Sequence, residues 1–118
     1  MSKRGFGSEG EYIVHDYLIG QGYEILAMNY RRPTGEIDVI AKQGRTVAFI
    51  EVKRRTTSRW GTPAEAVTPQ KRRRIVRTAL LFMQERGLMD ASVRFDIVEL
   101  TPGNVRHIEA AFDATGLC

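Results

Sequence analysis

The stretch GEIDVIAKQGRTVAFIEVKRR, residues 35–55, decides the fold of this chain, because it has the pattern of a β-hairpin. Two apolar arms, at 37–41 and 47–52, flank Gln43-Gly44, and glycine accepts the positive φ that a tight hairpin turn needs. With Gln43-Gly44 as a two-residue loop, Asp38 is expected opposite Phe49. The same register places Glu36 opposite Glu51 at the open end of the hairpin.

Side chains alternate between the two faces of a strand, so the hairpin divides its residues between two faces. One face is apolar except for Thr46, with Ile37, Val39, Ala41, Ala48, Ile50 and Val52. The other is apolar in its middle and charged at the open end, where Glu36, Asp38, Glu51 and Lys53 collect. Large apolar residues on both faces indicate a strand that is covered on both sides. The charges are therefore expected to line a cleft.

These charges predict a metal site. Carboxylates opposed across strands repel each other, and burying a charge without a partner is costly. A single lysine does not neutralise three carboxylates, whereas a divalent cation would. The alternative is a surface hairpin with solvated charges. The prediction depends on register, because a one-residue slip in the turn would send Asp38 to the other face from Glu51.

The whole chain, at 118 residues, is expected to form a single domain over 1–118 with a core of its own. Residues 1–7 are rich in glycine and basic residues and are expected to be disordered. Cys118 is the only cysteine, no signal peptide is visible, and the longest apolar runs fall far short of the ~20 residues that cross a bilayer. A cytoplasmic protein with no membrane partner is expected. The net charge of +4 is compatible with a polyanionic partner.

Periodicity and turn signals predict seven elements in the order α-β-β-β-α-β-β. Ser8 has the pattern of a helix N-cap, and Gly20 and Gly22 end that helix. Strands are expected at 23–30, in the two hairpin arms, at 92–100 and at about 104–110, with a turn at 31–34 and a loop at 55–67. Thr68 and Pro69 begin the second helix, which runs to about Arg86. This order predicts an α/β fold with a central mixed β-sheet flanked by helices.

The second helix opens with four basic residues, Lys71 to Arg74. Cations in a first turn oppose the helix dipole, and a bound phosphate would relieve that repulsion. Lys71 and Arg72 fall near the apolar stripe of Ile75, Val76, Ala79, Leu80 and Met83 and are expected to project towards the protein body. Arg74 and Arg77 are expected to face away. A solvated basic helix face is the alternative.

Further basic residues lie in or beside loops near the open end of the hairpin, among them Arg31, Arg54 and Arg55. Basic residues that converge on a carboxylate cluster suit a phosphodiester held over a metal. His15 and His107 are isolated, and a structural role is expected for each. Asp96, within RFDIVEL, is expected to make a polar contact at the end of a strand, and a role in a site is the alternative.

An acidic residue on a strand, a hairpin and then Glu-x-Lys on the next strand resemble the core of the PD-(D/E)XK nucleases. Over almost its whole length the chain resembles the YraN-like bacterial family, which is itself similar to the archaeal Holliday-junction resolvases. The matching pieces are GEYIVHDYL, GYEILAMNYR, GEIDVIA, VAFIEVKRR, AVTPQKRRRI and RFDIVEL. The resemblance implies a restriction-endonuclease-like core. One departure is Ile37, which precedes Asp38 where the motif has proline.

The resemblance also implies roles for individual residues. Asp38 and Glu51 would bind Mg²⁺ or Mn²⁺ together with the backbone carbonyl of Val52. Lys53 would hold the attacking water or steady charge in the transition state. Glu11, on the first helix, would orient a metal-bound water. Lys71 lies where such nucleases place a phosphate contact, and Glu36 matches the family's GEID without an assigned role.

The expected function is that of a metal-dependent endonuclease that hydrolyses phosphodiester bonds in DNA, with branched DNA as one candidate substrate. Arg31, Arg54, Arg55, Lys71 and Arg72 are the expected phosphate contacts. A homodimer is expected, since resolvases act symmetrically on two strands. Two alternatives stay open: a nucleic-acid-binding module or adaptor without catalysis, and a partner-binding protein whose charges are incidental.

Overall fold

The five strands of residues 9–55 and 67–114, the parts of the chain that the computed structural model describes, form one mixed sheet in the order β1-β2-β3-β4-β5. The strands are β1 (Glu24–Arg32), β2 (Gly35–Gln43), β3 (Thr46–Arg54), β4 (Ser92–Thr101) and β5 (Asn104–Phe112). The helices are α1 (Glu9–Gly20) and α2 (Pro69–Arg86). Only β3 and β4 are parallel, and α2 lies in the connection between them. The predicted order α-β-β-β-α-β-β is confirmed.

The hairpin of β2 and β3 is present, but its register differs from the prediction. Gln43 pairs with Thr46 and Ile40 with Phe49, so the loop is Gly44-Arg45. The predicted Gln43-Gly44 loop was wrong, as were the pairings of Asp38 with Phe49 and of Glu36 with Glu51. The physical reason is that the favoured two-residue turns need positive φ at their first residue, where Gly44 has φ 60°. The difference is an even number of residues, so the apolar residues of the hairpin other than Ile37 keep their predicted faces.

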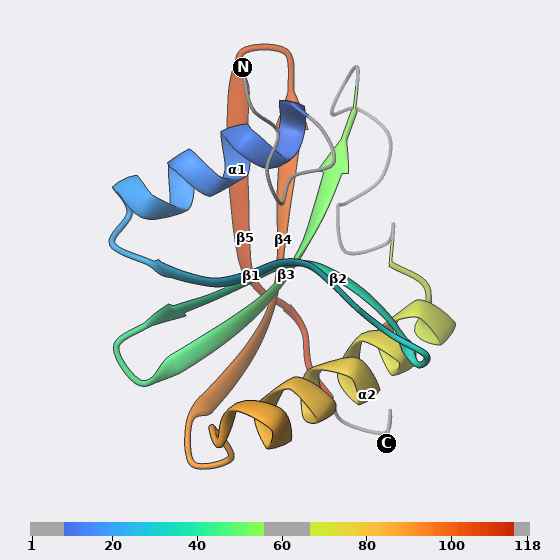
Figure 1. Ribbon diagram of the computed structural model, residues 1–118. Coiled ribbons are helices and arrows are strands. Elements are labelled where there is room, and N and C mark those ends of the chain that lie inside the picture. The colour runs from blue at the N-terminus through green and yellow to red at the C-terminus, as the bar shows by residue number, and fades with distance from the viewer. Residues whose placement is uncertain (1–8, 56–66, 115–118) are drawn as a thin grey trace.

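The two helices cover opposite faces of the twisted sheet (Figure 1). The cluster beneath α1 contains Val14, Leu18, Tyr23, Val39, Ala41, Ala48, Ile50, Val98 and Leu100. The cluster beneath α2 includes Ile40, Val47, Phe49, Ile75, Phe82, Phe95 and Ile97. Both faces of β2 and β3 are therefore buried, as the doubly apolar hairpin predicted.

Two predicted positions differ in the structure. Ile37, expected on the face with Val39, packs in the α2 cluster with Tyr30. Its partner Tyr30 on β1 follows Asn29, whose φ of 53° departs from the extended conformation of a strand. Leu80, expected in the core stripe of α2, is 45% exposed, and Phe82 is buried in the core instead.

The ends of α2 are those predicted from the sequence. The Thr68 hydroxyl accepts a hydrogen bond from the Lys71 amide at 3.2 Å, and Pro69 occupies the first turn. Gly87 ends the helix in the left-handed region, at φ 65°. The expected cap at Ser8, the disorder of residues 1–7 and most of the loop at 55–67 lie outside the described residues.

The sheet opens between β2 and β3 beyond the pair Val39–Ile50, where the pairing of these two strands ends. The Val52 amide donates to Asp38 Oδ2 at 2.8 Å, so a side chain takes the place of a backbone partner. Beyond this point β2 stays with β1, up to the pair Arg32–Gly35, while β3 continues beside β4. Figure 1 shows that the start of β2 lies beside α2, whereas the end of β3 points away from it. We call this opening, with Asp38 on one side and Glu51-Val52 on the other, the fork.

Candidate active site

A cavity of about 340 Å³ lies at the fork, on the side that α2 covers. Its lining residues come from β2, β3 and the start of α2: Gly35, Glu36, Asp38, Glu51, Thr68, Gln70, Lys71, Arg74 and Ile75. The hairpin and the basic start of α2, which are separate in the sequence, thus meet at one place. Three of the predicted site acids and Lys71 share this cavity.

Asp38 is half-buried and accepts a hydrogen bond from the Val52 amide. Burial, reinforced by the nearby charge of Glu51, raises the pKa of Asp38 to about 6, although the Val52 amide opposes the shift. A carboxyl group with a raised pKa beside a second carboxylate is an arrangement that a cation would relieve. The clustering of carboxylates predicted from the sequence is therefore present in the fold, with Lys71 beside them as a cation that the hairpin alone did not supply.

Glu51 is buried, at 4% exposure, and its Oε1 lies 2.9 Å from Lys71 Nζ. Burial alone would lower the pKa of Lys71, but the bond to Glu51 outweighs it and raises that pKa. For Lys53 the opposite holds: burial and the close approach of Lys71 lower its pKa. Lys53 and Lys71 thus stand together around Glu51, and the prediction that Lys71 projects towards the protein body is confirmed.

The remaining predicted acids lie at the margins of the site. Glu36 is exposed on the cavity wall and pairs with Arg31, whose Nε lies 3.2 Å from Glu36 Oε2. Glu11, in the first turn of α1, accepts a hydrogen bond at Oε1 from the side-chain amide of Asn29 at 3.0 Å. Glu11 does not line the cavity, and it reaches the sheet at Asn29 on β1.

The predicted phosphate contacts divide into two groups. Arg72 donates to the Val67 carbonyl and lies over the Phe112 ring, and Arg55 pairs with the buried Glu99 at 3.1 Å. Both are held by internal contacts. Arg31, Arg54 and Lys71 lie nearer the surface. Arg74, which was expected to face away from the body, lines the cavity.

Sequence reasoning missed some residues of this region. Thr68, Gln70 and Arg74 line the cavity because α2 starts beside Asp38 and Glu51. Arg74 follows Gln70 by four residues, the spacing of neighbours on one helix face, and this signal could have placed the two side by side. Glu99, at 2% exposure, pairs with Arg55 and with Arg106 and gave no sequence signal.

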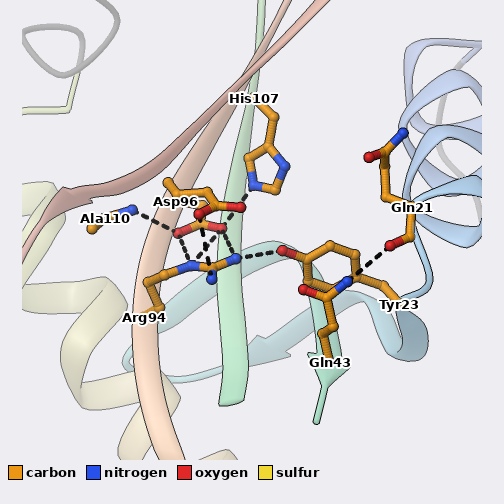
Figure 2. A network of polar contacts seen from close by, with 8 residues as sticks. Gln21, Tyr23, Gln43, Arg94, Asp96, His107 and Ala110 are labelled. Atoms are coloured by element: carbon orange, nitrogen blue, oxygen red, sulfur yellow. Dashed lines mark hydrogen bonds and ion pairs between the residues drawn. The ribbon is translucent and has the colours of Figure 1, made fainter.

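Asp96 belongs to a separate network on the other face of the sheet (Figure 2). It is fully buried and accepts hydrogen bonds from Arg94 and the Ala110 amide, with His107 Nε2 at 2.7 Å. Burial would raise the pKa of Asp96, but His107 and Arg94 hold it below its ordinary value. Arg94 also reaches the Tyr23 hydroxyl. These contacts tie β4 to β5 and to the start of β1, as expected for structural residues.

The donors at the fork fit a hard divalent cation. Within residues 9–55 and 67–114, no group of three His, Cys, Asp or Glu side chains is arranged to hold a metal ion. Mg²⁺, however, is usually held by one or two carboxylates and retains several waters. Asp38 and Glu51 supply two carboxylates. The N–H and carbonyl of a strand residue point to the same neighbouring strand, so the Val52 carbonyl, like its amide, faces Asp38.

The solved structure of Archaeoglobus fulgidus Hjc, a Holliday junction resolvase from an archaeal hyperthermophile, has a similar fold. The TM-score is 0.55 at 18% sequence identity, and the match covers 93% of this chain and 81% of the resolvase. At this identity the likeness shows the fold alone. The chain therefore has the restriction-endonuclease-like fold of the Hjc type, as the resemblance implied.

The sequence shows the family to which this chain belongs. The profile described as "Uncharacterised protein family UPF0102" matches residues 10–100, and the chain belongs to this family, the YraN-like family named above. A UPF0102 protein of Symbiobacterium thermophilum is 44% identical over 119 residues, covering 97% of this chain and 100% of the relative. One of Desulfosudis oleivorans is 42% identical over 114 residues, covering 95% and 93%.

Membrane insertion through a helix has no support in the part of the chain that the structure describes. Neither α1 nor α2 is long and apolar enough to span a bilayer.

Proposed function

We propose that this protein is a metal-dependent endonuclease that hydrolyses phosphodiester bonds in DNA, with branched DNA as the first substrate to test. The observation that carries the proposal is the meeting of Asp38, Glu51, Lys53 and Lys71 at the fork. A structural ion pair would need one carboxylate and one lysine. The fork instead brings two carboxylates, one with a raised pKa, together with two lysines, and Asp38, Glu51 and Lys71 line a cavity that opens to solvent.

In this proposal Asp38, Glu51 and the Val52 carbonyl hold Mg²⁺ or Mn²⁺. When bound, the cation supplies Lewis-acid stabilisation of the charge that develops on the phosphate oxygens. Lys53, whose lowered pKa makes proton exchange easier than for an exposed lysine, positions the attacking water. Glu11 acts at the edge of this arrangement, as a carboxylate that orients the water.

The nucleic acid would approach along the basic start of α2. Lys71 has its ammonium at the cavity and can exchange Glu51 for a phosphate oxygen. Arg31 and Arg74 supply exposed charge beside this cavity, and Arg54 supplies it at the end of β3, beside α1. Arg55 and Arg72 are held by internal contacts and act by keeping their segments in place. No acidic residue lies in the first turn of α2, so the helix dipole and these cations favour an anion together.

The test is a cleavage assay with labelled linear, flapped and four-way-junction DNA, in Mn²⁺ or Mg²⁺ and in EDTA. Asp38→Asn and Glu51→Gln are assayed beside the wild-type protein. The control is Asp16→Asn, which removes a carboxylate from the exposed face of α1. Products that need both the metal and Asp38, and that persist in Asp16→Asn, support the proposal.

The competing function is a nucleic-acid-binding module or adaptor without catalysis. It predicts salt-sensitive binding of the same DNA substrates without any metal-dependent product. Sedimentation of the free protein and of its junction complex tests the proposed homodimer separately. A strictly monomeric complex would argue against symmetric junction cleavage, though not against nicking.

A further inference from the structure

Asn29 is one of two residues other than glycine with a positive φ in the described parts of the chain, at 53°. Asparagine tolerates the left-handed region better than most residues, yet a strand residue with this conformation is unusual and costs free energy. Such outliers persist only where the surroundings hold them, and they cluster at functional sites. This conformation interrupts β1 just where the sheet opens.

The position of Asn29 links α1 to the fork. On β1 its neighbours Met28 and Tyr30 pair with Val39 and Ile37 of β2, so Asn29 lies across from Asp38, between these two pairs. Its side-chain amide donates to Glu11 Oε1 at 3.0 Å. Both side chains are half-buried. The carboxylate of α1 is thus attached to the one residue of β1 that borders Asp38.

We propose that Asn29 is a positioning residue of the candidate site, which holds the Glu11 carboxylate at the fork so that it acts on the cation and water there. This proposal rests on the metal site of the proposed function. The side-chain amide of Asn29 reaches α1, where its hydrogen bond holds the charged oxygen of Glu11. Neither residue needs to touch the metal for this role. Outer-shell partners of this kind typically change metal affinity by about tenfold or more.

The experiment measures Mn²⁺ affinity by calorimetry on folded, metal-free protein. Asn29→Gly keeps the positive φ and removes the amide, while Glu11→Gln keeps the hydrogen bond and removes the charge. Each is expected to weaken Mn²⁺ binding about tenfold. The double variant is expected to be no weaker than Glu11→Gln alone, because Asn29 acts through Glu11. Glu11→Asp, which keeps the charge but is too short to reach Asn29, is expected to weaken binding as well.

The matched control is Gln43→Ala. Gln43 Nε2 donates to the Gln21 carbonyl at 2.8 Å, so it also ties the sheet to the α1 region, but it lies five residues along β2 from Asp38, about 17 Å away. Unchanged Mn²⁺ affinity is expected. If Asn29→Gly lowers only the melting temperature, or if its effect adds to that of Glu11→Gln, the proposal is overturned.

Cleavage by the same variants separates this proposal from the nuclease function. If wild-type protein yields no product but the Mn²⁺ affinities follow the expected pattern, the nuclease proposal fails and the role of Asn29 stands. If wild-type protein cleaves DNA and Asn29→Gly matches it in both affinity and rate, only the role of Asn29 fails. No Mn²⁺ binding by wild-type protein overturns both.

Discussion

Asp38 is the residue whose ionisation the fold opposes most clearly. Its pKa of about 6 exceeds the ordinary 3.8, so the folded protein holds a proton there more tightly than the unfolded chain. The resulting stabilisation is complete below about pH 4 and is lost as the pH rises through 6. A shift of this size corresponds to about 3 kcal/mol at most.

Asp38→Asn should therefore make the metal-free protein more stable at pH 7.5, by an amount up to about 3 kcal/mol, and should have little effect at pH 4. Asparagine can still accept the hydrogen bond from the Val52 amide through its carbonyl. Urea unfolding in EDTA at several pH values measures the difference between variant and wild type. A difference that does not change between pH 4 and pH 7.5 would show that Asp38 titrates normally.

Lys71 holds the same carboxylate, Glu51, that the proposed cation needs. Lys71→Met should lower the stability of the metal-free protein by about 1 kcal/mol, because removal of the half-exposed ammonium takes away the lysine that pairs with the buried Glu51 carboxylate. It should also tighten Mn²⁺ binding, because the cation no longer competes with the ammonium. Arg73→Met removes an equal charge from the exposed side of the same helix turn. Equal changes in Mn²⁺ affinity for both variants would exclude direct competition.

At the scale of elements, the site depends on how closely α2 approaches β2. Gly35 begins β2 with φ 151°, and a Cβ built there would lie 3.3 Å from both Arg74 Cβ and Thr78 Oγ1. The side chain of Thr78 is engaged with the Thr34 hydroxyl at 2.7 Å, so it has little room to retreat. Glycine at this position therefore sets the contact between strand and helix.

Gly35→Ala should push α2 away from β2 and destabilise the protein by about 1–3 kcal/mol, through backbone strain and contact with α2. Thermal unfolding measures the loss. Gly20→Ala is the control, because no atom lies within 4 Å of a Cβ built there and its φ is not in the positive range. A Gly35→Ala protein as stable as Gly20→Ala would show that the close approach is not needed.

Local signals at the element ends could be predicted from the sequence, because they act within a few residues. Thr68, Pro69 and Gly87 fix the ends of α2 through the cap hydrogen bonds and backbone conformations that the residue types favour. The buried faces of the hairpin were also predictable, since alternation survives a two-residue change of register. The exact pairing was not predictable, because it depends on whether Gly44 takes the first or the second position of the two-residue turn.

Features that depend on distant contacts could not be predicted. The direction of Lys71 followed from its place on the helix, but its pairing with Glu51 requires the position of α2 on the sheet. Leu80 fits the apolar stripe by spacing and is nonetheless 45% exposed, at an open apolar pocket that it lines with Val93 and Phe95 of β4. Asn29 carries no sequence signal for a left-handed strand residue, and its bond to Glu11 spans 18 residues.

At the scale of the whole molecule, the proposed function requires that cations near the fork, rather than net charge, attract the nucleic acid. Arg54→Gln with Arg74→Gln should reduce the slope of log affinity against log salt by about 1.8, because two phosphate contacts are lost. Arg45→Gln with Arg86→Gln removes the same charge at the β2–β3 turn and at the end of α2. Fluorescence anisotropy over a salt series measures this slope for the two double variants. Equal slopes would indicate that the nucleic acid binds without preference for the cations near the fork.

The most direct test of the central claim is cleavage of a labelled four-way junction by purified wild-type and Asp38→Asn protein, with Mn²⁺ and with EDTA. We predict products only for the wild type with Mn²⁺, while both proteins bind the junction. Equal cleavage by the two proteins would contradict the assignment of the fork as the active site. Binding by both proteins without any product from junction, flap or linear DNA would contradict the proposed nuclease function.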